Sequence, residues 1–362
     1  FQDNVYFDAN SFSSTGQTVS ISATVADCKS MDWTGVINSP IFDVDNDLSI
    51  YGSLTFSADV TVSSINNADL NFKSTDSGNT ITFAGNEWLG NIYFEGLNGE
   101  WTLQDSLSLN NAFKDILVNK GTLNTNGNSI STGTFKVRNS ATANMSSSNI
   151  YCKYLVKIES SNYNTDNSTI YAIGSIFKEV ENNSNIRLLV MEQSNPSDIL
   201  GSGVYHRVDI NGSGVTEMFS ITADSIIVSP GKTLQLDGTV MVNDYLEMNG
   251  TCSLLSNLTG TGTLSSSTGN IVVNHTNIEE VTATGGASFV ANDSYDLGGN
   301  SGWTINSTTA KDYYWVGDGG SWEDGSHWAL TSGGAGSGCV PTFQDNVYFC
   351  LLYTSDAADD LR

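Results

Sequence analysis

The tripeptides Leu48-Ser49-Ile50, Leu70-Asn71-Phe72 and Ile92-Tyr93-Phe94 begin at intervals of 22 residues. Each has the pattern apolar-x-apolar, which is typical of a short strand with one buried face. The pattern recurs at steps mostly between 18 and 25 residues, at Ile116-Leu117-Val118, Phe135-Lys136-Val137, Leu155-Val156-Lys157-Ile158 and Ile176-Phe177, and again from Val208, Ile226, Leu246 and Ile271.

Short strands at this spacing, separated by Asn, Gly, Ser and Asp, predict the stacked turns of a parallel β-solenoid. Each turn would bury its inward Val, Ile, Leu and Phe side chains against the turns on either side. Asn and Gly suit the corners because they tolerate positive φ, and only 4 Pro fit a stack whose strands need their backbone donors. The predicted fold class is all-β, a right-handed parallel β-helix of about 15 turns.

Asn-Gly pairs leave a second architecture open. They begin at Asn98, Asn126, Asn211 and Asn249, and the same dipeptide is a strong signal for the two-residue turn of a β-hairpin. An antiparallel β-sandwich is therefore the alternative fold.

Composition excludes several classes of protein. The chain carries 39 Asp and Glu against 14 Lys and Arg, a net charge of −25, so nucleic-acid phosphates would repel it. It contains no run of about 18 apolar residues that would span a membrane as a helix. With 15 Phe, 14 Tyr and 7 Trp it can bury a large core, which argues against disorder.

An internal identity points to tandem repetition. The heptapeptide Phe1-Gln2-Asp3-Asn4-Val5-Tyr6-Phe7 recurs unchanged at Phe343-Gln344-Asp345-Asn346-Val347-Tyr348-Phe349, a period of 342 residues. We therefore expect one full repeat and the start of the next, taken from the middle of a longer polypeptide. Residues 1–40 would continue a preceding seam, 41–308 would form the solenoid, and 309–349 would form a Trp- and Gly-rich β seam that starts the next copy.

Residues 350–362 do not continue the repeat. The heptapeptide at 343–349 is followed by Cys350-Leu351-Leu352-Tyr353, where its first occurrence is followed by Asp8-Ala9-Asn10-Ser11. The string 350–362 resembles a translated sequencing adapter, and we set it aside as a probable artefact.

The seam motifs resemble a known group of proteins. They comprise Trp315-Val316-Gly317, Ser321-Trp322-x-Asp324, His327-Trp328, Cys339-Val340-Pro341 and Asp345-Asn346-Val347-Tyr348-Phe349, and they continue with Asp8-Ala9-Asn10-Ser11-Phe12 and Cys28-Lys29-x-Met31-Asp32-Trp33-Thr34. Together they are similar to a module of very large tandem-repeat proteins secreted or displayed by Bacteroidetes-type bacteria. The resemblance implies an extracellular adhesive or scaffolding role, commonly with type IX export, and it supplies no catalytic residue.

The cysteines make no metal-binding pattern, because none of the five forms a Cys-x-x-Cys pair. The repeat period would bring Cys339 close in sequence to the counterpart of Cys28 in the next copy. We therefore expect Cys28 and Cys339 each to form a disulfide with a partner in the adjacent repeat, with two buried free thiols as the alternative. The pairing of Cys152 and Cys252 is left open.

Two groups of residues invite a ligand. Asp43, Asp45 and Asp47 alternate as Ca²⁺ ligands do, but Leu48 and Leu54 stand where an EF-hand loop needs Gly and Glu, and a solvated acidic corner is the alternative. An aromatic cluster would either stack on sugar rings or form a small core between repeats, and its members are Trp315, Trp322, His327 and Trp328, with Tyr313 and Tyr314 beside them.

A third candidate is a basic strip. Lys136, Lys157 and Lys178 are spaced by 21 residues, so a solenoid would stack them into a surface for an anionic polysaccharide, unless Glu159 and its neighbours neutralise it. Parallel β-helices also host polysaccharide lyases and hydrolases, but no carboxylate pair stands out in the sequence. The function expected is a non-catalytic structural or adhesive repeat, with a glycan-binding or polysaccharide-degrading β-helix as the alternative. Its partners would be adjacent copies and extracellular polysaccharide, or a host or biofilm surface.

Overall fold

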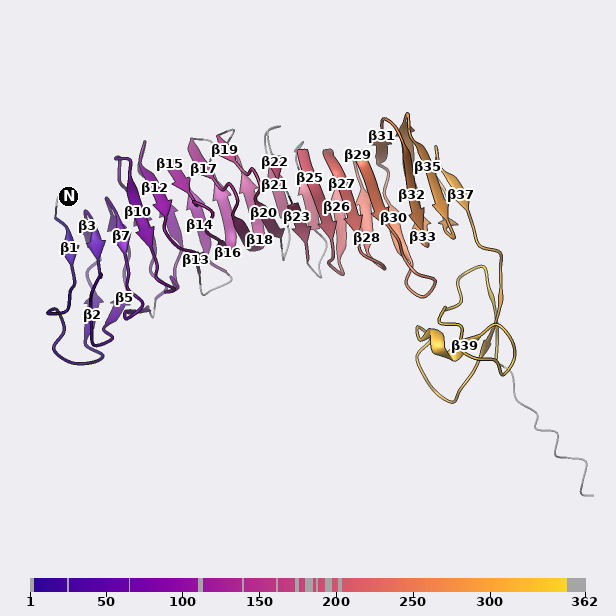
Figure 1. Ribbon diagram of the computed structural model, residues 1–362, viewed down its shortest axis with the longest axis horizontal. Helices are drawn as coiled ribbons and strands as arrows, with labels where there is room; N and C mark the ends of the chain where they lie inside the picture. The colour runs from indigo at the N-terminus through magenta and orange to yellow at the C-terminus, as the bar shows by residue number, and fades with distance from the viewer. Residues whose placement is uncertain are drawn as a thin grey trace, which may run out of the picture.

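The computed structural model is an elongated stack of strands that ends in a small lobe (Figure 1). It contains no α-helix within the part of the chain that it describes, and the stack has about 12 turns. The described residues are 3–24, 26–64, 66–109, 113–138, 140–160, 162–172, 176–179, 185–186, 188–192, 197–200 and 204–349.

Strands of successive turns pair in parallel ladders that run along the stack. One eight-stranded sheet has the order β1 (Val5–Tyr6), β4 (Met31–Asp32), β7 (Leu54–Thr55), β10 (Asn79–Thr82), β12 (Glu100–Leu103), β15 (Gly121–Asn124), β17 (Ala141–Asn144) and β19 (Tyr163–Asn164). The longest ladder comprises β3 (Ala26–Cys28), β6 (Leu48–Ile50), β9 (Leu70–Phe72), β11 (Ile92–Phe94), β14 (Asp115–Val118), β16 (Ile130–Val137), β18 (Asn149–Ile158), β21 (Ile176–Glu179), β24 (Ser197–Leu200), β26 (Val215–Met218), β28 (Thr233–Leu236), β30 (Ser256–Thr259), β33 (Thr276–Ile278) and β36 (Tyr295–Asp296).

The other solenoid strands form further parallel ladders. They are β2 (Thr18–Ile21), β5 (Ile41–Val44), β8 (Thr61–Ser63), β13 (Leu107–Ser108), β20 (Thr169–Ala172), β22 (Asn185–Ile186), β23 (Leu188–Met191), β25 (Val204–Ile210), β27 (Ile221–Val228), β29 (Thr239–Met248), β31 (Thr263–Ser266), β32 (Asn270–Asn274), β34 (Thr282–Gly285), β35 (Ser288–Asn292) and β37 (Thr304–Asn306). Every one of these ladders is parallel, so the predicted β-solenoid is confirmed and the antiparallel sandwich is excluded.

One turn shows how the chain winds. It runs through β14, β15 and the first half of β16, and the second half of β16 then lies in register beside β14. The stack ends at β37, and the chain after it leaves the stack for the small lobe. The stack has about 12 turns, fewer than the 15 or so expected.

The core consists of inward side chains stacked turn on turn. Leu70, Ile92 and Ile116 occupy one register position on three successive turns, and all three are fully buried. Beside them the rings of Phe72 and Phe94 stack with centroids 5.1 Å apart. Each turn therefore buries its apolar residues against its neighbours, as the alternation in the sequence indicates.

The Asn-Gly signals mark corners of the solenoid. Asn98 has φ of 63° and Asn126 has φ of 54°, in the left-handed region that Asn tolerates, and Gly127 follows with φ of 78°. These residues turn the chain from one parallel ladder to the next instead of closing a hairpin.

A ladder of carboxylates and amides ties four turns together at another corner. The amide of Asp69 donates to Asp47 Oδ1 at 2.9 Å, that of Asn91 to Asp69 Oδ1 at 2.9 Å, and that of Asp115 to Asn91 Oδ1 at 3.0 Å. Each of these side chains thus satisfies a backbone donor of the following turn. We call Asp47, Asp69, Asn91 and Asp115 the Asx ladder.

The charge of Asp69 weakens this ladder. Burial and the nearby Asp47 carboxylate raise the pKa of Asp69, even though bonds from Asn91 oppose the shift. A raised carboxyl pKa in the folded state means that stability increases as the pH falls through that pKa. Ionised Asp69 therefore costs stability at neutral pH.

Replacing Asp69 with Asn should stabilise the protein, because the amide oxygen still accepts the Asn91 bond while the buried charge is lost. We expect Asp69→Asn to raise the free energy of unfolding by about 0.5 kcal/mol at pH 7 and by less at pH 3. Asp69→Ala removes the acceptor and should lower it by about 1–3 kcal/mol. Urea titrations at both pH values measure this, and a stabilisation that persists at pH 3 would contradict the explanation.

Candidate functional site

The small lobe is formed by residues 309–349, and we refer to it as the seam. Its three-stranded sheet has the order β39 (Trp328–Ala329), β38 (Asp312–Trp315) and β40 (Asn346–Tyr348), and a 3₁₀ turn, η1 (Gly325–His327), precedes β39. Asp324 caps η1 by accepting a bond from the Ser326 amide at 2.9 Å. The β38–β40 pair is parallel and the β38–β39 pair is antiparallel.

The four predicted aromatic-site residues do come together in the seam. Trp315 stacks on His327 with ring centroids 4.8 Å apart, and it meets Trp328 edge-to-face at 5.0 Å. Trp322 meets Trp328 at 4.7 Å, and the Trp328 indole N–H donates to the Trp322 carbonyl at 2.8 Å.

Their burial decides how much of the cluster a sugar could reach. Trp328 is completely buried, so its faces are occupied by its neighbours, whereas Trp322 is 46% exposed. His327 Nδ1 lies 2.9 Å from the Val316 carbonyl, and a side chain at Gly320 would collide with the His327 ring, so the 317–320 loop encloses the imidazole. The arrangement is that of a small core with one exposed indole at its edge.

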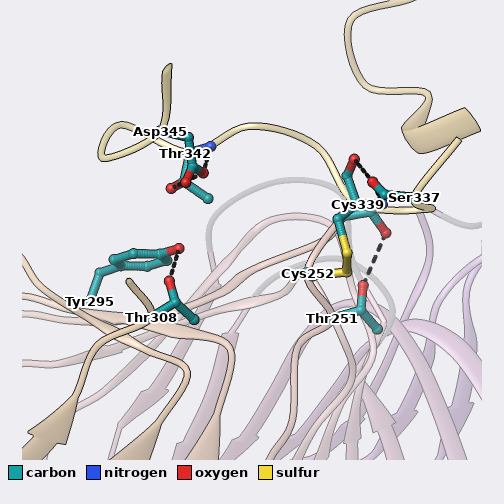
Figure 2. The surroundings of a disulfide bond; sticks show 9 residues. Thr251, Cys252, Tyr295, Thr308, Ser337, Cys339, Thr342 and Asp345 are labelled. Carbon is teal, nitrogen blue, oxygen red and sulfur yellow. Dashed lines mark hydrogen bonds between the residues drawn. A yellow bond between two sulfur atoms is a disulfide. The ribbon is translucent and has the colours of Figure 1, made fainter. Parts of the chain in front are cut away.

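A disulfide joins the seam to the solenoid (Figure 2). Cys339 is bonded to Cys252, which lies between β29 and β30 and 87 residues earlier in the chain. This corrects the prediction that Cys339 pairs with a cysteine of the adjacent repeat, because its sulfur is already used within the repeat. A ring contact between Tyr295 and Phe343, with centroids 5.1 Å apart, adds a second attachment.

Cys28 and Cys152 are free and buried. The disulfide predicted for Cys28 requires a cysteine of the adjacent repeat, so it stays a prediction. Burial raises the pKa of the Cys28 thiol to about 11, with a smaller contribution from the Asp27 carboxylate, and burial also raises the pKa of Cys152. Both thiols therefore stay protonated and pack as small apolar side chains.

The basic strip is only partly neutralised where the structure describes it. Lys136 and Lys157 are in register on adjacent turns, and Lys178 continues the register in the backbone, although its side chain lies outside the described residues. Lys136 lies 3.5 Å from Glu159, and Lys157 also binds this carboxylate. These bonds, that of Lys157 first, lower the pKa of Glu159. The single Glu159 carboxylate thus forms ion pairs with both lysines.

The three predicted calcium ligands do not converge. Asp43 accepts a bond from the Ser63 hydroxyl at 2.9 Å, Asp47 belongs to the Asx ladder, and the Asp45 carbonyl accepts from the Asn66 side chain at 3.3 Å. Among the described residues no three His, Cys, Asp or Glu side chains are placed to hold a metal ion. In this structure the aspartates bond to the chain itself.

One carboxylate pair escaped the sequence analysis. Asp198 of β24 and Glu217 of β26 are in register on adjacent turns, and burial, the charges of Asp198 and Asp237 and a hydrogen bond with Asp198 raise the pKa of Glu217. A hydrogen-bonded pair lies closer than the roughly 5–10 Å that separates the two carboxyls of glycoside hydrolases. The two carboxyl groups therefore lie closer together than those of a glycoside hydrolase.

A shallow polar groove is a second feature that sequence reasoning missed. It has a volume of about 570 Å³, and its lining includes Thr102, Asn124, Asn126, Asn144 and Ser146 from successive turns. Asn144 donates to Asn124 Oδ1 at 2.5 Å, and Asn124 donates to Glu100 at 2.7 Å. The sequence did indicate this contact, because Asn124 and Asn144 are 20 residues apart, which is the length of one turn.

No protein-family model matches the chain, and no match was found among curated proteins or solved structures. In the described part of the chain, no helix has the length and apolar character needed to cross a membrane.

The disulfide should fix the seam. A cross-link that closes a loop of 87 residues lowers the conformational entropy of the unfolded chain, which stabilises the folded state by about 4 kcal/mol. We expect Cys339→Ser to make residues 309–349 sensitive to limited proteolysis while the solenoid stays resistant. Peptide mapping without reductant should also recover a cross-linked peptide containing Cys252 and Cys339. Cys152→Ala is the matched control, and equal resistance of the Cys339→Ser seam would show that the disulfide does not hold it.

Proposed function

We propose that this chain is a non-catalytic structural and adhesive repeat of an extracellular bacterial surface protein. The observation that carries the proposal is the identity of residues 1–7 and 343–349 at the two ends of one solenoid and its seam. A unit that ends with the sequence on which it begins is suited to head-to-tail repetition, which lengthens a rod without a new fold.

The physical properties of the unit support a load-bearing role. The described strands of the solenoid pair through parallel ladders along the stack, and their core is continuous from turn to turn. The Cys252–Cys339 disulfide is of a kind that persists in oxidising, extracellular surroundings. A net charge of −25 keeps such rods apart through mutual repulsion.

Surface labelling of cells that carry the gene tests this proposal. Antibodies against the chain should stain intact cells, and proteinase K added outside should remove the signal while a cytosolic marker survives. A denaturing gel should show a protein several times larger than the 38.7 kDa of this chain. Antigen confined to the cytosol would contradict the surface location, and a protein of single-repeat size would contradict the tandem arrangement.

Glycan binding is the second candidate, favoured by the polar groove. Asn and Ser side chains from adjacent turns present amide and hydroxyl groups at intervals of one turn, which suits the hydroxyls of an extended sugar chain. The exposed Trp322 supplies a separate aromatic face in the seam.

A screen of neutral and acidic glycans separates the two candidates. If the groove binds, Asn144→Ala should weaken binding at least about tenfold, while Asn277→Ala, which breaks a similar bond to Asn257 elsewhere, should leave it unchanged. Loss on Trp322→Ala alone would place binding in the seam. Cleavage of a glycan that disappears in Glu217→Gln would instead support an enzyme.

A further inference from the structure

The repeated heptapeptide pairs differently at its two occurrences. At residues 1–7 it forms β1, which lies parallel to β4 in the first turn, with Val5 opposite Met31. At residues 343–349 it forms β40, which lies parallel to β38 of the seam, with Val347 opposite Tyr313. We propose that one copy of this strand makes both pairings at once, so that it joins the seam of one repeat to the first turn of the next. This inference rests on the proposed tandem arrangement.

The backbone leaves both edges of the strand available for this. Asn346 donates its amide to the Lys311 carbonyl at 2.9 Å, on the β38 side. At the first occurrence the donors are Val5, to the Ser30 carbonyl, and Phe7, to the Asp32 carbonyl, both at 2.8 Å. Since successive amides of a strand point to opposite edges, the two sets of bonds use different edges.

The amides of Val347 and Phe349 correspond to those of Val5 and Phe7, and they point away from β38. β40 is the edge strand of the seam sheet, and an open edge of this kind pairs readily with another strand. Within the described residues these two amides donate to no acceptor, and their counterparts bind β4 at the first occurrence.

The polar groups of the segment are also compatible with both roles. The Asp345 carboxylate accepts bonds from the Lys311 amide at 2.8 Å and the Thr342 amide at 2.7 Å, within the seam. At the first occurrence the Asp3 backbone carbonyl, a different atom, accepts from the Lys29 amide at 2.8 Å. No atom of this aspartate is needed twice.

The side chains would extend one aromatic core through the junction. Phe7 stacks on the fully buried Trp33 with centroids 3.8 Å apart. Its equivalent, Phe349, already lies 5.9 Å from Trp328 and 6.1 Å from Trp315, yet is 66% exposed. Trp33 of the next copy would cover that exposed surface.

Alternation along the strand places the same residues inward in both settings. Val5 and Phe7 pack against the solenoid core while Tyr6 is 67% exposed. In the seam, Phe349 faces the tryptophans, and Tyr348 stacks on Tyr314 at 5.0 Å on the other face of the sheet. A strand has two faces, and the same face of this strand is directed toward the core in the seam and in the first turn.

A two-copy protein, residues 1–342 followed directly by 1–349, tests the shared strand. Hydrogen exchange with single-residue resolution would be followed in the junction peptide, which is unique because it runs from Thr342 into Asp8-Ala9-Asn10-Ser11 of the second copy. We expect the amides of Val347 and Phe349 to exchange at least about 100-fold more slowly than in the single chain, with Asn346 still protected. Protection of Val347 gained at the expense of Asn346 would show that the pairings exclude each other, and unchanged exchange of Val347 would overturn the proposal.

Val347→Pro is the matched variant. It removes an amide that faces away from β38, so the seam of the single chain should keep its Asn346 protection. In the two-copy protein this substitution should return the Phe349 amide to the fast exchange that it shows in the single chain. If the Phe349 amide stays protected, its protection does not come from edge pairing. Because this experiment does not depend on the natural number of copies, its failure is distinguishable from failure of the proposed function.

Discussion

A turn of this solenoid has no core of its own, and that constraint governs the rest of the structure. Ile92 is buried only because Leu70 and Ile116 lie on either side of it in the same register position. Stability therefore accumulates as contacts between neighbouring turns, and every interruption of register exposes apolar surface on two turns at once. The ends of the stack face the same requirement, since the last turn has a neighbour on one side only.

The corners must preserve register without adding apolar area, and the Asx ladder does this by hydrogen bonding. A side-chain oxygen of one turn accepts from the backbone of the next, which fixes the height of the strand that follows. The same proximity brings Asp47 close to Asp69, and burial together with this like charge raises the pKa of Asp69. Asn91 occupies the equivalent place without charge, so the ladder tolerates either residue because only the oxygen is required.

Sequence spacing predicted the fold because a solenoid is periodic in one dimension, and the apolar positions of one turn specify those of the next. The aromatic seam cluster was predicted for a similar reason, since its members lie within 14 residues. Cys252 was not assigned as the partner of Cys339, because their approach depends on how the seam folds back toward the last turns, which no local spacing records. Residues of the Asx ladder, like Asn124 and Asn144, are spaced by about one turn in the sequence. Polar residues are common at corners, however, so only the strand register shows which of them contact each other.

The seam lies at the end of the stack, where the last turn has a neighbour on one side only. Its tryptophans form a small closed core, and the disulfide and the Tyr295–Phe343 contact attach that core beside the last turns. The strand β40 is then held extended, with one edge bonded to β38, as β1 is bonded to β4. In the tandem arrangement that we propose, a strand already ordered by the preceding seam would lose little further entropy when the next first turn pairs with it. A seam of this design would order the next repeat while closing its own.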